Sequence, residues 1–505
     1  MSGTSHPPNI VVVVLDCVRA DALALGSRTL SGMPFLRRFR SQCVAYERAV
    51  APAPWTLPSH ASLFTGAYPW EHRAHARGGN WLDSRTPRLA GKMRALGYQT
   101  LSFSANDLVS PITNLVDGFQ SAYWGGWWEL LLRTGRRSRA PKRYRQPEGL
   151  EPLLRLRRSE GARKVLKGFS KAAWANTAYL DLGSRIAQRV LAPQSHGPCH
   201  VAPWVVPEFS RAVARVPASK PLFGFVNLLD AHEPYYPNPG ALHGLTEWGW
   251  YLTSRQDKQG WLSLEYVPNE KDLVRLRALY EQAVRSMDFS LGSIVHALQK
   301  SGRWENTLFV LTADHGQAFG EHGLLYHGLH VAEPLLRVPL LVRFPGSEGH
   351  GERVPQWSSL VDLEPTLLEA AGGPEMARGP GVPLSELRRG RARPRQVLAA
   401  SEGSTRAFGN APMAAVSRER FDRVRTAAYY GPIKLQFDAV SEKIQAFDVL
   451  QDPGETRDIW GMQRGRVLDL EDPLRRAAAM MSVREGSLDS RARSVEERLT
   501  RWGYD

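Results

Sequence analysis

The chain has 505 residues, 43% of them hydrophobic and 23% charged, which is typical of a globular protein and excludes a disordered, collagen-like or coiled-coil chain. Lysine and arginine outnumber aspartate and glutamate by 65 to 50, and the formal net charge of +15 favours anionic partners such as nucleic acid, a lipid surface or a phosphate- or sulfate-bearing substrate. Three cysteines are too few for a disulfide scaffold.

The first apolar run, residues 10–15, ends at Asp16 and predicts a buried strand. It is too short for a signal peptide or a membrane span, and no stretch of the chain reaches the ~18 apolar residues that a spanning helix needs. We therefore expect a cytoplasmic protein without a transmembrane segment. Peripheral membrane contact stays open, and the sequence sets no oligomeric state.

Residues 55–66 predict a helix that begins near Ser59, because Pro58 is followed by small and apolar residues. Thr56 then lies just before the helix N-terminus, where free N–H groups favour an anion. Its hydroxyl is either an N-cap or, with a metal ion nearby, a nucleophile.

A second helix is expected at 86–96, followed by a strand at 99–103. From about 121 to 220 this pattern breaks, and Trp124, Trp127 and Trp128 precede a basic stretch. Residues 133–171 hold 14 lysines and arginines against 3 acidic residues, a net charge of +11. This insertion is a solvated basic segment, a lid, a dimer contact or a membrane-surface patch. No nucleic-acid module is present, so we do not expect nucleic acid as a partner.

Three apolar runs share one design, since each ends in an aspartate. They are 10–15 before Asp16, 222–229 before Asp230, and 307–313 before Asp314. An acid where a parallel strand stops lies at the carboxyl edge of the sheet, where α/β folds place their sites. One such aspartate alone would be a turn or a cap, but three together predict a shared site.

Residues 269–301 have the apolar spacing of an amphipathic helix, and a further strand is expected at 338–344. Alternating helices and strands predict an α/β fold with a doubly wound, mostly parallel sheet. We expect a catalytic domain over residues 1–390, with the insertion inside it. A C-terminal subdomain with a short antiparallel sheet and a helix is expected over 391–505.

Asp314 and His315 follow the last of the three runs and offer a carboxylate and an imidazole to one cation. His322, His327 and His330 come shortly afterwards. A turn at the strand end, with solvated loop histidines, is the competing interpretation.

These segments together resemble the alkaline phosphatase superfamily, in its sulfatase-like branch of sulfatases, phosphonate monoester hydrolases and phosphodiesterases. The matching stretches are 15–21 and 304–323 for the metal motifs, 58–66 for the nucleophile motif, 337–339, 361–366, and 447–455 for the C-terminal signature. The resemblance implies an alkaline-phosphatase-like fold and a hydrolase that acts on phosphoric or sulfuric esters.

The resemblance also implies the roles of individual residues. One divalent metal ion, zinc or manganese rather than calcium or magnesium, would be held by Asp16, Thr56, Asp314 and His315. The expected catalytic residues are Thr56 as nucleophile, with His232 or His327 assisting the leaving group. The expected substrate-binding residues are Asn80, Asn106, His60 and Arg19. Cys17 is a soft ligand or a buried small residue. A second metal ion on Asp230, His232 or His327 stays open, although their spacing differs from that of two-zinc phosphatases.

The sequence departs from the sulfatase pattern at several of these positions. Sulfatases make formylglycine from cysteine or serine, whereas oxidation of Thr56 would give a ketone. His60 replaces the family's arginine, and Ala105 and Asp107 replace a Lys-x-His pair. Cys17 stands where many sulfatases have the second of two aspartates, and His327 falls near an anion-binding lysine.

These departures favour cleavage or transfer of a phosphoester, a phosphodiester or a phosphate or phosphonate monoester, through a covalent Thr56 intermediate. The alternative is sulfuric ester hydrolysis without formylglycine. A second alternative is an inactive scaffold that binds anions or nucleic acid. The expected partner of the active enzyme is an anionic small-molecule or lipid-like substrate.

Overall fold

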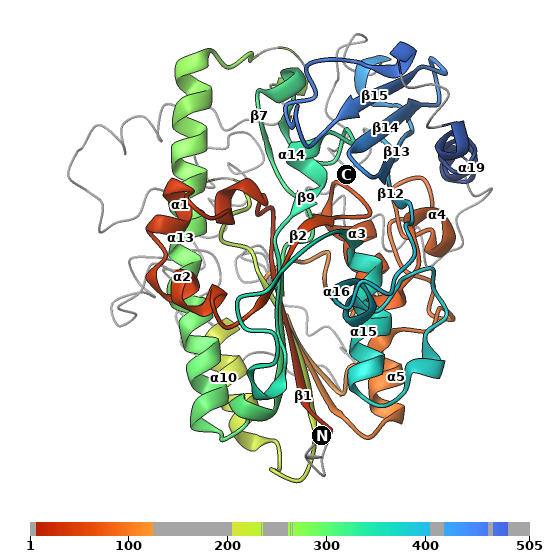
Figure 1. The fold of residues 1–505 in the computed structure, drawn as a ribbon. Helices are drawn as coiled ribbons and strands as arrows, with labels where there is room; N and C mark the ends of the chain where they lie inside the picture. The colour runs from red at the N-terminus through yellow and green to blue at the C-terminus, as the bar shows by residue number, and fades with distance from the viewer. Residues whose placement is uncertain are drawn as a thin grey trace, which may run out of the picture.

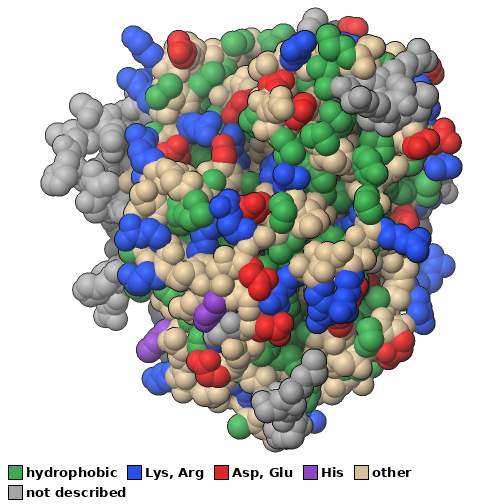
Figure 2. Space-filling model, in the orientation of Figure 1, with side chains coloured by type: hydrophobic (Ala, Val, Ile, Leu, Met, Phe, Trp, Pro, Cys, Tyr) green, Lys and Arg blue, Asp and Glu red, His purple; other side chains and the backbone are tan. Residues whose placement is uncertain are grey.

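The computed structural model describes residues 7–124, 205–233, 235, 261–262, 264, 266–403, 419–462 and 468–482. The basic stretch 133–171, Trp127 and Trp128 lie outside these described residues. On the described part of the face shown in Figure 2, lysine and arginine side chains are interspersed with acidic ones.

The centre of the main sheet is strand β1 (Asn9–Leu15), in which all seven residues are buried. It pairs in parallel with β5 (Leu222–Leu228) and β6 (Thr307–Thr312), as the apolar runs predicted. The strand order is β11-β2-β10-β6-β1-β5-β3-β4, with β9 paired to β2. The other strands are β2 (Val44–Val50), β3 (Gln99–Ser104), β4 (Ser121–Trp124), β9 (Arg337–Val338), β10 (Leu340–Arg343) and β11 (Arg353–Ser359).

Helices cover both faces of this sheet, which confirms the doubly wound α/β fold (Figure 1). On one side lie α1 (Arg28–Ser31), α2 (Pro34–Arg40), α10 (Val205–Arg215) and α13 (Glu270–Lys300). On the other side lie α3 (Thr56–Thr65), α5 (Leu89–Ala95), α15 (Leu363–Ala370) and α16 (Leu384–Arg388). Among the described helices, none combines the length and apolar content needed to cross a membrane.

The strand register brings the ends of β1, β5 and β6 together. Val14 of β1 is opposite Asn227 of β5 on one side and Thr312 of β6 on the other. The backbone N–H of Asp16 continues the ladder by donating to the carbonyl of Leu228 at 2.9 Å. The loops that follow the three strands therefore start side by side at the carboxyl edge of the sheet, as expected from the three aspartates.

A second sheet is antiparallel and confirms the expected C-terminal subdomain. Its strands are β12 (Val397–Ser401), β13 (Arg425–Tyr430), β14 (Ile433–Asp438) and β15 (Ile444–Asp448). Helix α19 (Glu471–Ser482) packs on it through Leu474 and Met481. A two-stranded ribbon of β7 (Ala318–Phe319) and β8 (Leu325–Tyr326) and the short helices α4 (Pro69–His72) and α14 (Glu333–Leu336) complete the described elements used below. The domain boundary at residue 390 stays a prediction.

The structure differs from the sequence-based expectation in three elements. Helix α3 begins at Thr56 rather than near Ser59, because Pro58 is tolerated in a first turn whose N–H groups have no helical partner. The strand expected at 338–344 is split at Pro339 into β9 and β10. Residues 121–124 and 205–215, expected within the insertion, form β4 beside β3 and helix α10 against α13.

Candidate active site

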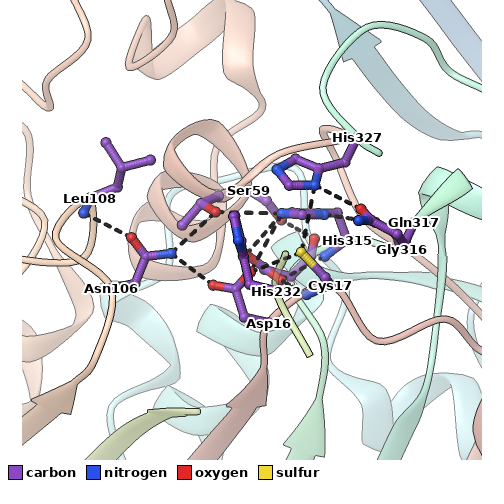
Figure 3. Close-up of polar contacts among 12 residues, drawn as sticks. Asp16, Cys17, Ser59, Asn106, Leu108, His232, His315, Gly316, Gln317 and His327 are labelled. Atoms are coloured by element: carbon purple, nitrogen blue, oxygen red, sulfur yellow. Dashed lines mark hydrogen bonds and ion pairs between the residues drawn. The ribbon is translucent and has the colours of Figure 1, made fainter. Parts of the chain in front are cut away.

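The candidate site lies where the loops after β1, β3, β5 and β6 meet the N-terminus of α3 (Figure 3). Asp16 follows β1, Asn106 follows β3, and His315 follows β6. Thr56 is the first residue of α3, so its side chain sits at the positive end of the helix dipole. Asp16, Thr56 and His315 are all buried. The sheet edge and one helix end thus bring together residues that are up to 299 positions apart.

The Nε2 atom of His315 is the centre of this cluster. It lies 3.4 Å from Oδ2 of Asp314, 3.5 Å from Oγ1 of Thr56 and 3.9 Å from Oδ1 of Asp16. Its Nδ1 lies 2.9 Å from the carbonyl oxygen of Gly316, so Nδ1–H donates there and Nε2 carries the lone pair. Burial lowers the pKa of His315 to about 4, so the imidazole is neutral near pH 7.

The lone pair on Nε2 of His315 and the two carboxylates around it are all electron-rich, so a cation bound among them would relieve their mutual repulsion. Oδ2 of Asp314 is buried, and within the described residues it has no hydrogen-bond donor. Burial and the neighbouring Asp16 raise the pKa of Asp314 well above its usual range when no cation is present. Two carboxylates, an imidazole and a hydroxyl form a donor set that suits a divalent metal ion. The four residues predicted as ligands, Asp16, Thr56, Asp314 and His315, therefore fit the ion.

A metal ion bound here would lower the pKa of the Thr56 hydroxyl and neutralise negative charge that develops on a bound ester. The chain itself holds the ligands in place. The backbone N–H groups of Cys17 and His315 donate to Oδ1 of Asp314 at 3.2 and 3.0 Å, which turns Oδ2 toward Nε2 of His315. Cys17 has a φ of 62°, a left-handed conformation that is uncommon for a residue other than glycine and typical of functional turns.

Asn106 contacts two of the predicted metal ligands, on the other side of the cluster. Its Nδ2 donates to Oδ2 of Asp16 at 2.8 Å and lies 3.5 Å from Oγ1 of Thr56. Its own Oδ1 accepts the backbone N–H of Leu108 at 2.9 Å, which fixes the orientation of the amide. Asn106 was predicted to bind substrate. The structure places it at the site, where it also orients Asp16.

His60 follows Thr56 by four residues in α3 and contacts the same cluster. Its Nδ1 is 2.9 Å from the carbonyl oxygen of Thr56 and 3.5 Å from Oδ2 of Asp314. The ring is fully buried against Phe225, and this burial lowers the pKa of His60. Ser59 lies nearby and donates from Oγ to the carbonyl oxygen of Asp314 at 2.6 Å. His60 and Ser59 thus join the first turn of α3 to the loop after β6.

The two histidines predicted to assist the leaving group lie beside the predicted metal ligand His315. The ring centre of His327 is 4.4 Å from that of His315 and 5.0 Å from that of His232. Nδ1 of His327 is 2.8 Å from Oε1 of Gln317, and Nδ1 of His232 is 2.6 Å from the carbonyl oxygen of Glu233. Their predicted catalytic role is therefore consistent with their positions and stays a prediction.

Two predicted substrate-binding residues, Arg19 and Asn80, make their contacts away from this cluster. Arg19 is buried and donates to Asp21, to Oε1 of Glu321 at 2.6 Å and to the carbonyl oxygen of Gln317 at 2.9 Å. Asn80 has a φ of 57° and donates its backbone N–H to the carbonyl of His75 at 3.1 Å. The structure joins neither residue to the Thr56 cluster, and their role in binding stays a prediction.

Gln317 and Glu233 also lie at this site, although the sequence did not predict either of them. Nε2 of Gln317 donates to Oε2 of Glu233 at 2.8 Å and to the hydroxyl of Tyr235. Among the described residues, ligand-type side chains come together in two groups, Asp16, Cys17 and His315, and Cys17, His232, Glu233 and His327. Asp230, in the loop after β5, is in neither group. A signal was present in the sequence, since Glu233 directly follows His232 and Gln317 lies three residues after Asp314.

The fold and the ligand cluster define a metal-dependent ester hydrolase of the alkaline phosphatase superfamily. Residues 8–373 match the family model described as Sulfatase, and the chain belongs to this family. An arylsulfatase of Clostridium perfringens is 25% identical over 387 residues, which cover 72% of this chain and 75% of the relative. The multifunctional alkaline phosphatase superfamily protein PehA of Trinickia caryophylli is 25% identical over 404 residues, covering 72% and 74%.

Solved structures confirm the fold. The phosphonate monoester hydrolase of Agrobacterium radiobacter has a TM-score of 0.62 at 19% identity, covering 94% of this chain and 96% of that one. A putative sulfatase from Bacteroides thetaiotaomicron also has a TM-score of 0.62, at 15% identity, covering 97% and 96%. The family assignment makes the chain an ester-hydrolysing enzyme, which argues against the inactive scaffold that was the second alternative.

Proposed function

We propose that this chain hydrolyses sulfuric esters with the help of a divalent cation held by Asp16, Thr56, Asp314 and His315. The family match over residues 8–373 is the observation that carries the proposal, and similarity to the Clostridium perfringens arylsulfatase supports it. This activity was the alternative to phosphoester cleavage, and the comparisons support it better than the main prediction. We further propose an anionic small molecule or a glycan sulfate as substrate, and zinc or manganese as the ion.

Thr56 is the proposed nucleophile. Its deprotonated Oγ1 attacks sulfur as the bond from sulfur to the leaving oxygen breaks, and His232 or His327 donates a proton to the departing alcohol. The products of this step are a threonine sulfate and the free alcohol. Because Thr56 has one oxygen on Cβ, it cannot expel sulfate by elimination as an aldehyde hydrate does. Water attacks the sulfur of the threonine sulfate instead, which releases hydrogensulfate and restores Thr56.

Phosphoester hydrolysis is the second candidate, and the identity of Thr56 favours it. A phosphothreonine is released by in-line attack of water at phosphorus and needs no aldehyde chemistry. The superfamily relative PehA, described as multifunctional, is as similar to this chain in identity as the arylsulfatase is. The two candidates use the same residues and differ in whether sulfur or phosphorus is attacked.

A panel of esters of one phenol tests the two candidates. The sulfate, phosphate, phosphodiester and phosphonate esters of 4-nitrophenol are compared with the full chain in the presence of Zn²⁺ or Mn²⁺. We expect kcat/KM for the sulfate to be about tenfold or more above the values for the phosphorus esters. The reverse order would replace the proposal with the second candidate. In H₂¹⁸O the label should appear in sulfate rather than in the phenol, since the proposal breaks the sulfur–oxygen bond.

Variants at Thr56 test the nucleophile separately. T56S keeps a hydroxyl and should retain measurable activity, whereas T56V keeps the shape and should lose at least about 10³-fold in kcat. S62A changes another hydroxyl of α3 that faces His72 and serves as a control. Turnover by T56V close to that of the wild type would show that water, and not Thr56, attacks the ester.

A further inference from the structure

We propose that the chain binds a second divalent cation, of zinc type, on Cys17, His232, Glu233 and His327, beside the site of Asp16, Asp314 and His315. This cluster comes from the loops after β1 and β5 and from the segment after β8 (Figure 3). The proposal does not depend on which ester the enzyme cleaves. The sequence left open a second ion on Asp230, His232 or His327, and the structure groups Cys17 and Glu233, rather than Asp230, with the two histidines.

The spacing of the ligand atoms fits one ion. One nitrogen, oxygen or sulfur atom from each of the four side chains lies within 4.8 Å of the corresponding atoms of the other three. Nδ1 of His327 is 3.6 Å from Sγ of Cys17 and 3.6 Å from Oε2 of Glu233. Zinc bonds of about 2.0–2.3 Å in a tetrahedron place ligand atoms roughly 3.3–3.8 Å apart. The two distances from Nδ1 of His327 therefore match a tetrahedral zinc ion.

The chemistry of the four ligands also points to zinc. A thiolate, two imidazoles and a carboxylate are a soft and borderline set that suits Zn²⁺ and not Ca²⁺ or Mg²⁺. Two of the four residues are departures from the sulfatase pattern, since Cys17 replaces an aspartate and His327 falls near a lysine. Both departures introduce a zinc-type ligand.

Neighbouring polar groups form hydrogen bonds with the side chains of these four residues. Gln317 donates from Nε2 to Oε2 of Glu233 at 2.8 Å and so orients that ligand. Its Oε1 accepts from Nδ1 of His327 at 2.8 Å in the metal-free chain. The carbonyl oxygen of Glu233 lies 2.6 Å from Nδ1 of His232, which leaves Nε2 of that ring for a cation. Such contacts fix the orientation of metal-binding histidines and carboxylates. Binding would replace the proton that His327 shares with Gln317.

The second site adjoins the first, because the ring centres of His315 and His327 are 4.4 Å apart. A pair of ions at such positions would stabilise the attacking and leaving oxygens of one ester, provided that the second ion becomes five-coordinate when the leaving oxygen joins its four protein ligands. Ligation would also prevent His232 and His327 from donating a proton, so the leaving oxygen would be stabilised by the cation instead. His232 and His327 are therefore metal ligands if the second ion binds, and one of them is a proton donor if it does not.

Metal content and thiolate spectroscopy test this proposal without measuring activity. The purified full chain is stripped with chelator and titrated with Zn²⁺ and, separately, with Co²⁺. We expect about two ions per wild-type chain and about one in C17A, E233Q and D314N. The Co²⁺ form should show a thiolate-to-cobalt charge-transfer band in the near ultraviolet, and this band should disappear in C17A and persist in D314N.

C43A is the matched control, because Cys43 is buried and its thiol contacts the carbonyl oxygen of Phe39 instead of the site. It should keep two ions and the charge-transfer band. Circular dichroism of each variant establishes that it is folded, and E233Q provides a second reading if C17A is not. One ion in the wild type, no thiolate band, or two ions in C17A and E233Q would each overturn the second site.

Discussion

Asn106 and Asp16 are joined by a hydrogen bond of 2.8 Å from Nδ2 to Oδ2, although β5 separates their strands, β3 and β1, in the sheet. The bond spans the edge above β5 and leaves Oδ1 of Asp16 facing Nε2 of His315 at 3.9 Å. One amide thus sets which carboxylate oxygen is available to a cation. It also approaches the hydroxyl of Thr56, so metal binding and the position of the nucleophile depend on the same side chain.

Replacing this amide should weaken metal binding and catalysis together. N106A removes the donor to Asp16 and should lower metal affinity and kcat/KM by about 10–100-fold, the usual effect of losing a contact that orients a metal ligand. N106D places a carboxylate against Asp16 and should raise the metal requirement further or abolish folding of the site. Calorimetric titration of Zn²⁺ and initial rates check both effects. An N106A variant with normal metal affinity and a raised KM alone would make Asn106 a substrate-binding residue only.

Lys434 should be essential for attaching the C-terminal sheet to the main fold. Its buried Nζ lies 2.7 Å from Oε1 of Glu455 and 3.1 Å from Oε1 of Glu333, and it donates to the carbonyl of Val331 at 2.7 Å. K434M would leave two buried carboxylates without this cation, a change that typically costs about 3–5 kcal/mol of unfolding free energy. Urea denaturation measures the loss. K443M, at an exposed position, is the control, and equal stability of the two variants would contradict the prediction.

The strands and the meeting of the candidate metal ligands were the most predictable parts of this molecule. Continuous apolar runs placed β1, β5 and β6 within one residue at each end, because strands buried on both faces leave no polar interruption. Asp16, Asp314 and His315 were predicted because acids and imidazoles directly follow those strands. Their meeting point follows from parallel strand order alone, which is a general property of such sheets.

The contacts that depend on loop paths were not predictable. Glu233 and Gln317 are 84 positions apart, and only the folding of two loops brings their side chains within 2.8 Å. The contact between Arg19 and Glu321 was unpredictable for the same reason, since the two residues are 302 positions apart and no local pattern indicates the pair. The start of α3 was misplaced because a proline in the third helical position looks like a proline at the beginning of a helix.

His72 should make the stability of the fold depend on pH. Nδ1 accepts the backbone N–H of Ala74 at 3.0 Å, and Nε2 lies 3.0 Å from Oγ of Ser62, so the neutral ring is fully bonded. Burial, and then the neighbouring His75, lower the pKa of His72 from 6.5 to about 3. His72 is therefore protonated below pH about 6.5 in the unfolded chain but only below pH about 3 in the folded chain. The stability that His72 contributes is complete above this window and is lost as the pH falls through it.

The expected slope is about 1.4 kcal/mol of unfolding free energy per pH unit within that window. H72N, whose amide oxygen replaces Nδ1 as acceptor, should reduce the wild-type slope by roughly this amount. Urea denaturation between pH 6.5 and 4 gives both slopes. H350Q, at an exposed position, controls for the loss of a histidine as such. Parallel slopes for H72N and the wild type would show that the ring takes up its proton in the folded state.

Asp314→Asn should stabilise the metal-free protein while removing its response to metal. The amide oxygen of asparagine still accepts the N–H groups of Cys17 and His315 that now bond to Oδ1 at 3.2 and 3.0 Å. Its Nδ2 would take the place of Oδ2, 3.4 Å from Nε2 of His315, and would donate to a lone pair that now faces a carboxylate. Relief of this unfavourable contact should add about 1–3 kcal/mol to the unfolding free energy without metal.

Added Zn²⁺ should raise the melting temperature of the wild type through preferential binding to the folded chain, and should raise that of D314N much less. Thermal unfolding with chelator and with Zn²⁺ measures both effects, and D469N, at an exposed position, controls for the loss of one carboxylate. If D314N without metal were less stable than the wild type, the carboxylates would not repel one another in the metal-free fold. Proteins commonly give up stability at a functional site in this way, because a ligand that holds a cation is poorly accommodated without it.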